Sequence, residues 1–282
     1  MSSVIEICHL TKRYGKQRGV SDVSFTVEQG DIFGFLGPNG AGKSTTIRSL
    51  LGLIHYQSGQ LRVLGYDAKK EHTHIMQQVG YLPSETWFYP NVTVNDILKL
   101  AAEARRCDCS EERQFLCDKL QLDMHRKISD LSLGNRKKVG IVCAMQHRPR
   151  LYIFDEPTSG LDPLIQSIFF DLIHKHVEEG ATCLLSTHVL SEVRDHCNRV
   201  AIMKDGRLLC CNSVAHLTRG HSKRIRMIRD GIKLDYLYHG SLDDLYKELE
   251  GHHIGDILIE EPSIEEIFMH YYGGEGTDVD AF

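Results

Sequence analysis

Two segments near the start of the chain alternate apolar and polar residues. Residues 4–10 and 20–27 show this period of two, which is typical of half-exposed β-strands. Gly15 and Gly19 lie in the connection between them, where glycine favours a turn. We therefore expect an antiparallel pair of strands at the beginning of the fold.

Further along, short apolar runs alternate with patterns of helical period. Apolar runs predict strands over residues 31–36, 79–83, 151–154 and 183–185, and residues 58–65 are typical of a turn followed by a strand. Helical spacing predicts helices over residues 44–54, over residues 111–122 and after residue 135, and Thr93 with Asp96 predicts a capped helix start. This alternation indicates an α/β fold in which residues 84–135 form a helical insert.

The pattern changes after about residue 215. Residues 223–229, 233–238 and 254–260 have strand patterns, and residues 242–250 and 263–272 have helical ones. Polar residues in this region form no chemical grouping, and the glycines near the end are expected to fray. We predict a main domain over residues 1–215 and a small accessory α+β extension over residues 216–282.

Composition limits the classes of function. The chain has 282 residues and a net charge of −5, so we expect no general attraction to nucleic acid. No apolar run reaches the roughly 20 residues that cross a bilayer, and the first residues lack the pattern of a signal peptide. The nine cysteines are odd in number and lack zinc-site spacing, so we expect free thiols in a reducing compartment.

Residues 37–45 carry the strongest chemical motif. Gly37, Gly42, Lys43 and Ser44 fit the pattern G-x-x-x-x-G-K-S/T. In this pattern backbone N–H groups wrap around phosphate oxygens at a helix N-terminus. Lys43 is expected to reach the β- and γ-phosphates, and Ser44 to place its hydroxyl on Mg²⁺. A glycine-rich turn with a solvated lysine is disfavoured, because a strand pattern precedes the motif and a helical pattern follows it.

A pair of acids follows the buried strand pattern of residues 151–154. Asp155 and Glu156 come at the carboxyl end of this run, where ligands bind in doubly wound sheets. Burying two carboxylates without a cation is costly, so Mg²⁺ or its water is the natural partner. We expect Asp155 to hold Mg²⁺ and Glu156 to orient or activate an attacking water. The alternative is a turn with two solvated acids.

His188 and Tyr14 can each be interpreted as structural or as functional residues. His188 follows the strand pattern at residues 183–185, which places it at the same expected edge of the sheet as Glu156. It is suited there to contact a γ-phosphate, although a single histidine is more often structural. Tyr14 can pack within the first hairpin or offer a flat face to an adenine ring.

The segment before the helix at residue 135 is similarly open to two interpretations. Ser132 and Gly134 can belong to an ordinary helix cap or to a second phosphate-binding helix terminus. Arg136, Lys137 and Lys138 follow directly. Taken alone, these basic residues are expected to form a solvated face.

In the order and approximate spacing of its motifs, the chain resembles the nucleotide-binding subunit of ATP-binding cassette (ABC) transporters over nearly its whole length. The matching segments are GPNGAGKST at 37–45, LSLGN at 131–135, LYIFDEPTSGLDP at 151–163 and STH at 186–188. The resemblance implies an α/β P-loop NTPase cassette with an antiparallel β subdomain. It also implies that two cassettes close head to tail on two MgATP.

The resemblance implies roles for individual residues. Tyr14 would stack on adenine, and His188 would contact the γ-phosphate. Ser132 and Gly134 would contact the nucleotide that the opposite subunit holds, and residues 159–162 would couple the two sites. The acid pair after residue 154 would serve Mg²⁺ and water. The phosphates would be held by Gly37, Pro38, Asn39, Gly40, Ala41, Gly42, Lys43, Ser44 and Thr45.

Two features depart from the family pattern. The usual LSGGQ segment is LSLGN here, with Leu133 and Asn135 in place of a glycine and the glutamine, but its serine and second glycine remain. The family's glutamine after the strand at 79–83, which links Mg²⁺ to the membrane partner, is replaced by Ser84, followed by Glu85. Either the metal contact runs through water or Glu85, or coupling is altered. We hypothesise that turnover persists and that coupling to the partner is tuned.

The sequence therefore predicts a Mg²⁺-dependent ATPase subunit that powers a separate transmembrane permease from the cytoplasmic face of the cell membrane. Two copies of this chain are the expected pair, because catalytic and signature elements are both present. Residues 261–268 resemble those of separate-subunit exporters of the ABC-2 type, which favours export. The aromatic cluster of Trp87, Phe88 and Tyr89 either docks a cytoplasmic helix of the permease or packs inside the helical insert.

Two other classes of function compete with this prediction. One is a soluble cassette ATPase that acts on ribosomes or nucleic acid. Such proteins usually carry two cassettes or a long coiled coil, whereas this chain has one phosphate motif and no sustained heptads. The other is a nucleotide-gated regulator with little turnover, which would be expected to lack Glu156. We expect no nucleic-acid partner, and we expect the permease to select the cargo.

Overall fold

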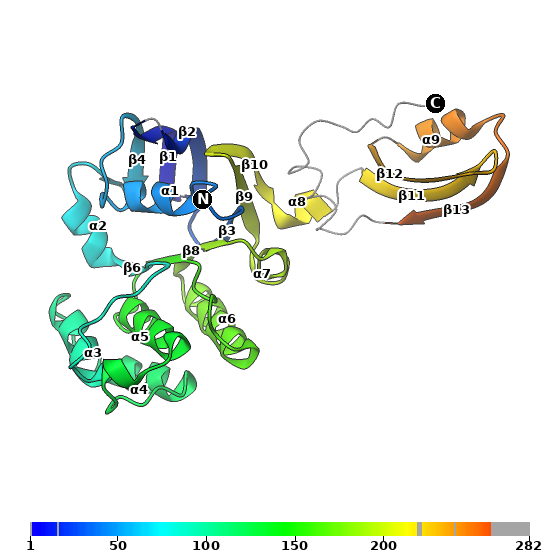
Figure 1. Ribbon diagram of the computed structural model, residues 1–282. Helices are drawn as coiled ribbons and strands as arrows, with labels where there is room; N and C mark the ends of the chain where they lie inside the picture. The colour runs from blue at the N-terminus through cyan, green and yellow to red at the C-terminus, as the bar shows by residue number, and fades with distance from the viewer. Residues whose placement is uncertain (1, 16, 219–221, 240, 261–282) are drawn as a thin grey trace. The chain divides into compact units, whose positions relative to one another are not determined.

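The computed structural model describes residues 2–15, 17–218, 222–239 and 241–260 (Figure 1). By its internal contacts the chain separates into two compact units, residues 1–211 and 212–282. The first unit contains the phosphate motif at 37–45 and the segments at 131–135, 151–163 and 186–188. In the described ranges, no helix is both long and apolar enough to cross a membrane.

A six-stranded sheet forms the centre of the first unit, in the order β10-β9-β3-β8-β7-β6. Its strands are β3 (Ile32–Leu36), β6 (Val79–Leu82), β7 (Leu151–Asp155), β8 (Thr182–Thr187), β9 (Arg199–Lys204) and β10 (Arg207–Ser213). The strands from β6 to β9 pair in parallel, so the carboxyl ends of β3, β6, β7 and β8 lie at one edge. Leu36 pairs with Thr187 and Asp155 with Ser186, which brings the expected site residues into register.

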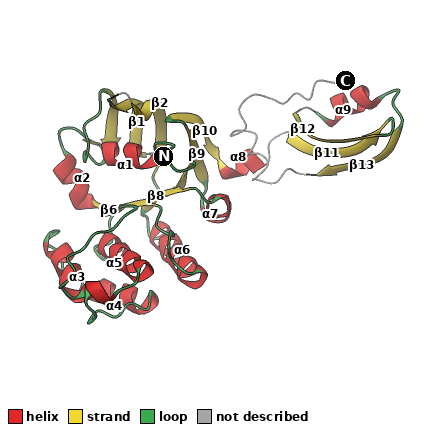
Figure 2. Ribbon diagram, in the orientation of Figure 1, coloured by secondary structure: helices red, strands yellow, loops and turns green. Residues whose placement is uncertain are grey.

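A second, antiparallel sheet flanks the central one (Figure 2). Its strands are β1 (Ser3–Tyr14), β2 (Gln17–Glu28), β4 (Ser58–Val63) and β5 (Tyr66–Asp67), in the order β2-β1-β4-β5. The predicted antiparallel pair is confirmed, but both strands are longer than the alternation indicated. As a result, Tyr14 is the last residue of β1.

Apolar side chains cover both faces of the central sheet. On one face, Phe25 of β2 stacks on Phe33 with ring centroids 5.4 Å apart, in a core shared with α1 (Lys43–Leu50) and α2 (His72–Gln78). On the other face, Phe154 packs edge-on against Phe169 of α6 (Pro163–Glu178), with centroids 5.3 Å apart. Burial on both sides explains the uninterrupted apolar run of β7.

The predicted helical insert lies between β6 and α5 (Leu133–Met145), and its helices pack against α5. It contains α3 (Val94–Glu103), α4 (Ser110–Lys119) and the 3₁₀ turn η1 (Ile128–Asp130). The capping box is confirmed, because Thr93 Oγ1 accepts from the Asp96 N–H at 3.2 Å and Asp96 Oδ2 accepts from the Thr93 N–H at 3.0 Å. These two polar residues therefore cap the start of α3, as their spacing predicted.

Three helix boundaries differ from the prediction. α1 ends at Leu50 rather than at residue 54, because Gly52 turns the chain with φ 68° and its backbone packs against Ala68 and His72. α4 ends at Lys119 rather than at residue 122. α5 begins at Leu133, so the glycine at position 134 lies inside its first turn rather than ahead of it.

The remaining elements are α7 (Leu190–His196) in the first unit, and α8 (Val214–Thr218) and a small α+β fold in the second. The small fold consists of β11 (Ser222–Arg229), β12 (Ile232–His239), α9 (Leu242–Leu249) and β13 (Ile254–Glu260). Among the residues that the structure describes there, Ile225, Met227 and Leu245 form its buried apolar cluster. The three predicted strands and the helix near 242–250 are confirmed, whereas the helix predicted at 263–272, the segment 261–268 and the final glycines lie outside the described residues.

Candidate nucleotide-binding and catalytic site

The predicted phosphate loop connects β3 to α1. The Gly37 N–H donates to the Thr187 carbonyl oxygen of β8 at 3.2 Å, which fixes the start of the loop. Gly42 is the N-cap of α1 with φ 103°, and a β-carbon there would lie 2.5 Å from Val20 Cγ1. Residues 38–40 between these points are exposed. The loop is therefore fixed at both ends and accessible in its middle, as a phosphate-binding loop must be.

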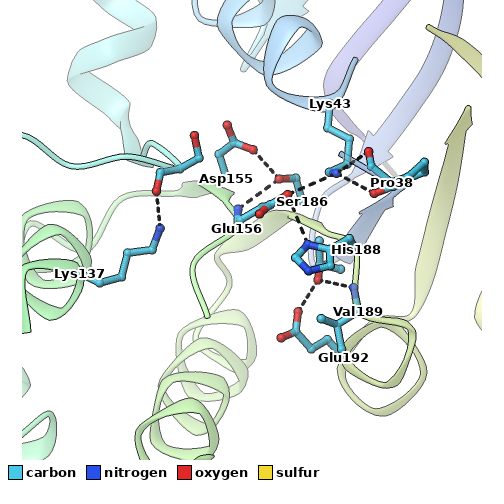
Figure 3. Close-up of polar contacts among 12 residues, drawn as sticks. Pro38, Lys43, Lys137, Asp155, Glu156, Ser186, His188, Val189 and Glu192 are labelled. Atoms are coloured by element: carbon cyan, nitrogen blue, oxygen red, sulfur yellow. Dashed lines mark hydrogen bonds and ion pairs between the residues drawn. The ribbon is translucent and has the colours of Figure 1, made fainter. Parts of the chain in front are cut away.

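The Lys43 ammonium lies across this loop (Figure 3). Its Nζ donates to the carbonyl oxygens of Gly37 at 2.7 Å and Pro38 at 3.2 Å. It also lies 3.4 Å from Glu156 Oε1, with only 4% of the side chain exposed. Ser44 and Thr45 follow as half-buried residues of the first turn of α1. Lys43 thus joins the phosphate loop to the acid pair.

Asp155 is completely buried at the end of β7. Its Oδ1 accepts a hydrogen bond from Ser186 Oγ at 2.6 Å, whereas its Oδ2 is buried without a hydrogen-bond partner among the described residues. A buried, unpaired carboxylate oxygen is costly unless a cation takes it. Mg²⁺ prefers oxygen ligands and is usually held by one or two carboxylates together with substrate phosphates. Asp155 therefore fits the predicted metal, and the Ser44 hydroxyl stays a predicted second ligand.

Glu156 has an unusual backbone conformation that aims its side chain at Lys43 and His188. Its φ of 51° lies in the left-handed region, which non-glycine residues rarely adopt outside functional sites and turns. Its N–H donates to both the carbonyl oxygen and Oγ of Ser186, at 3.1 and 3.2 Å. Its Oε1 lies 3.5 Å from His188 Nδ1 as well as near Lys43. The carboxylate is one-fifth exposed, which suits a base that contacts water.

His188 is held in place by the turn that leads from β8 into α7. Thr187 Oγ1 donates to Glu192 Oε2 at 2.6 Å and accepts from the Val189 N–H at 3.0 Å. His188 itself is 47% exposed, so one edge of its ring remains available to a ligand. The structure therefore brings Lys43, Glu156 and His188 together at the carboxyl edge of the sheet. Each of them follows a parallel strand, and the sequence predicted this edge for the acid pair and for His188.

Three other predicted site residues lie elsewhere and make no hydrogen bond or ion pair with this trio within the described residues. Tyr14 is 41% exposed, and Lys12 Nζ lies 4.8 Å from the centroid of its ring. Ser132 is confirmed as a helix cap, because its Oγ accepts from the Asn135 N–H at 3.3 Å. A β-carbon on Gly134 would lie 2.7 Å from the Gly160 carbonyl oxygen, so this glycine packs against the segment at 159–162. Their roles toward nucleotide remain predictions.

The expectation of a solvated face at residues 136–138 is wrong for both lysines. Lys137 is 4% exposed and Lys138 is 8% exposed. Lys137 Nζ donates to the Ser84 carbonyl oxygen at 2.9 Å. Burial lowers the pKa of Lys137, while the Asp155 and Glu156 carboxylates act in the opposite direction. Three consecutive basic residues at a helix start have no apolar–polar pattern, so the sequence could not indicate which of them are buried.

Two further findings change the sequence-based account. Ser186 binds both Asp155 and Glu156, although its only signal was a place in the Ser-Thr-His segment. The alternative that the aromatic cluster packs inside the helical insert is wrong for two of its members. Trp87 is 87% exposed and Tyr89 is 74% exposed. Phe88 is half-buried.

Comparison with known proteins identifies the family. A model of the family described as ABC transporter matches residues 20–159. The bacitracin transport ATP-binding protein BcrA of Bacillus licheniformis is 33% identical over 304 aligned positions, which cover 97% of this chain and 99% of BcrA. The chain belongs to the ABC transporter ATP-binding proteins. A second model, described as "AAA domain, putative AbiEii toxin, Type IV TA system", matches residues 125–194.

Other relatives and solved structures of ABC proteins agree with this assignment. The linearmycin resistance ATP-binding protein LnrL of Bacillus subtilis (strain 168) is 28% identical over 94% of this chain and 97% of LnrL. The structure of an ATP-binding subunit of an ABC transporter is 31% identical with a TM-score of 0.71, covering 87% of this chain and 99% of that one. A dimeric ATP-binding cassette bound to ADP and Pi, MJ0796, shares the fold at 22% identity and a TM-score of 0.67, over 74% of this chain and 98% of its own. The predicted fold class is confirmed.

Proposed function

We propose that this ABC protein hydrolyses ATP with Mg²⁺ and thereby powers a separate membrane-spanning permease that exports its cargo. The observation that carries the proposal is the convergence on Glu156 Oε1 of the Lys43 ammonium at 3.4 Å and His188 Nδ1 at 3.5 Å. Relatives named for bacitracin transport and linearmycin resistance support the export of a small molecule.

The proposed chemistry follows from what each side chain can reach. The exposed backbone of residues 38–40 would surround the phosphates, and Lys43 would turn from its two carbonyl partners to the β- and γ-phosphate oxygens. Glu156 would hold the attacking water and accept its proton, while His188 would contact the γ-phosphate. Asp155 and Ser44 would hold Mg²⁺, which would neutralise the charge that develops on the phosphates.

A second ATP-binding subunit would complete the site, and a second copy of this chain is our proposal for it. Ser132 and Gly134 would contact nucleotide across the interface, with residues 159–162 coupling the two sites. Gly134 and Gly160 already lie in close contact within one chain, so both segments would move together as the pair closes. Tyr14 would cover the adenine ring with the part of its side chain that is exposed.

The proposed place of action is the cytoplasmic face of the cell membrane, where the permease would supply the spanning helices. The exposed Trp87 and Tyr89 follow β6 at the edge of the sheet that carries the site. Two large aromatic side chains exposed two residues apart in one loop favour a protein contact. We assign this loop, residues 84–89, to the permease interface and name it the docking loop.

Copurification from membranes tests the proposal. The full chain would be tagged and recovered from gently solubilised native membranes together with its partners. We expect a stoichiometric multi-span membrane protein whose complex hydrolyses MgATP. We further expect its recovery to fall in a Trp87→Ser, Tyr89→Ser double variant. The control is Tyr246→Ser, which removes a 66% exposed aromatic residue from α9. Recovery only with ribosomes, with nucleic acid or alone would contradict the transporter function.

A further inference from the structure

Two cysteines lie at the junction between α3 and α4 of the helical insert (Figure 1). Cys107 and Cys109 are separated by one residue, and their Sγ atoms lie 2.8 Å apart. A disulfide bond is about 2.05 Å long, so the two sulfur atoms need to approach by less than about 1 Å to form one. The two thiols are therefore already placed for a bond between them.

Backbone hydrogen bonds at the end of α3 hold Cys107 in this position. Arg106 has a left-handed φ of 53°, and its N–H donates to the Glu103 carbonyl oxygen at 2.9 Å. The Cys107 N–H donates to the Ala102 carbonyl oxygen at 3.4 Å. These two bonds form the Schellman motif that commonly ends a helix. Cys107 is therefore fixed relative to α3 by the way in which that helix ends.

The start of α4 holds Cys109 in a similar way. Cys109 is the N-cap of α4, and its carbonyl oxygen accepts from the Arg113 N–H at 2.8 Å. Between the two cysteines, Asp108 Oδ1 accepts from the Ser110 N–H at 2.9 Å, which fixes the turn. Both thiols are thus held by the backbone before any bond forms, so little further chain entropy is lost when it does.

The two thiols differ in their access to solvent. Cys107 is exposed, whereas Cys109 is only 4% exposed. Burial, with a smaller contribution from the hydrogen bond to Cys107, raises the pKa of Cys109 to about 12. An accessible thiol next to a second thiol that can resolve it is typical of cysteines that respond to oxidants. Cys107 is therefore the thiol that an oxidant meets first.

We propose that Cys107 and Cys109 form a reversible oxidation site, which closes into an intramolecular disulfide when the protein meets hydrogen peroxide. The Cys107 thiolate attacks one peroxide oxygen and the O–O bond breaks, which gives a sulfenic acid and a hydroxide that takes up the proton released by the thiol. Cys109 Sγ then attacks Cys107 Sγ, the S–O bond breaks, and the leaving hydroxide takes up the Cys109 proton. Two thiols are thereby oxidised to one disulfide, and the peroxide is reduced to two molecules of water.

The disulfide is expected to be easy to reduce. It would close a small ring over residues 107–109, and one of its sulfur atoms belongs to an exposed residue. Strained or exposed disulfides have more oxidising reduction potentials than structural ones. We therefore expect the pair to stay reduced in a reducing compartment and to close only while peroxide is present. This property is additional to the proposed ATPase function and does not depend on it.

Peptide mapping of the full chain tests the proposal. The reduced protein is treated with hydrogen peroxide under native conditions, the remaining thiols are blocked with iodoacetamide, and the protein is digested with trypsin. Trypsin cuts after Arg106 and Arg113, which releases residues 107–113 with these two cysteines alone. In the wild type we expect this peptide to lose two hydrogen atoms and to take up no iodoacetamide. Dithiothreitol added before blocking should restore both thiols.

Two variants separate the roles of the thiols, and a third is the matched control. Cys109→Ser leaves Cys107 without its resolving thiol, so dimedone should trap the sulfenic acid at least about tenfold more than in the wild type. Cys107→Ser should leave Cys109 reduced at the same peroxide concentration. Cys8→Ser removes an exposed thiol from β1, and its 107–109 pair should close as in the wild type.

Absence of the closed peptide from the peroxide-treated wild type would overturn the proposal. Equal trapping of the Cys107 sulfenic acid in the wild type and in Cys109→Ser would do the same. So would a sulfinic acid on Cys107 in place of the disulfide, or a disulfide between two chains. If Cys109→Ser fails to fold, Cys109→Ala provides the same comparison, because it also removes the resolving thiol.

Discussion

The phosphate loop at residues 37–45 and the docking loop at residues 84–89 follow two strands of the same parallel sheet, yet they are specified in different ways. The residues that shape the phosphate loop, its glycines and Lys43, lie within one contiguous motif, and the loop is anchored to β8 through the Gly37 N–H. The docking loop is seated by residues far along the chain, Lys137 and Gly140 of α5. The phosphate-binding motif is therefore local in sequence, whereas the seat of the docking loop is built from tertiary contacts.

The largest expected effect lies in the phosphate loop. Lys43→Met removes the ammonium that lies across the loop and touches Glu156. Loss of such a preorganised charge should lower the rate of ATP hydrolysis by about 100-fold or more. Steady-state phosphate release by the purified chain measures this, with Lys138→Met as the control for a buried lysine outside the loop. A rate close to wild type would remove Lys43 from the mechanism.

The second effect tests how tightly the docking loop is seated. Gly140→Ala would place a β-carbon 2.6 Å from Leu82 Cδ1. Overpacking of this kind should lower the free energy of unfolding by about 1–3 kcal/mol, despite the better helix propensity of alanine. Urea denaturation measures the change. Gly255→Ala serves as the control, since a β-carbon there would meet only ordinary contacts at 3.6 Å or more. An increase in stability would show that the loop yields easily.

The third effect is a pH dependence of stability on the α5 side of the fold. Burial, with a smaller contribution from the Arg105 cation, lowers the pKa of His147 to about 3. Arg105 Nε donates to His147 Nε2 at 2.9 Å, so the neutral ring is the form that the fold accepts. The unfolded chain takes up a proton below about pH 6.5, while the folded chain does not until about pH 3. Stability should therefore fall as pH is lowered through this window, by roughly 1 kcal/mol per pH unit.

His147→Gln tests this assignment, because glutamine keeps an acceptor for Arg105 and does not titrate. Thermal unfolding between pH 7 and pH 5 should show a shallower loss of stability in the variant than in the wild type. Equal slopes would assign the acid sensitivity to other groups, among them His176, whose pKa burial also lowers.

The smallest effect on the isolated chain concerns the exposed aromatic residue of the docking loop. Trp87→Ser should change the free energy of unfolding by less than about 0.5 kcal/mol, since the side chain is 87% exposed. Basal ATP hydrolysis should be unchanged, while stimulation by the copurified permease should be lost. Undiminished stimulation would place the permease interface elsewhere.

The same contrast explains what could be predicted from the sequence. Asp155, Glu156 and His188 follow apolar runs, so their strands and their shared edge could be inferred from pattern alone. The burial of Lys137 could not, because whether a lysine faces solvent or a neighbouring loop depends on the distant element that packs against it. The strained φ of Glu156 and its bonds to Ser186 are likewise set by the register between β7 and β8.

The proposed function depends above all on Glu156, at the end of β7, acting as the base for ATP hydrolysis, and Glu156→Gln tests this role. The variant keeps the shape of the side chain and removes its basicity. ATP binding with Mg²⁺ and phosphate release would be measured on the same preparations of wild type and variant. We predict equal binding and a loss of hydrolysis of about 100-fold or more, the contribution expected of a positioned base. Hydrolysis at the wild-type rate, or no Mg²⁺-dependent hydrolysis by the wild type, would contradict the claim.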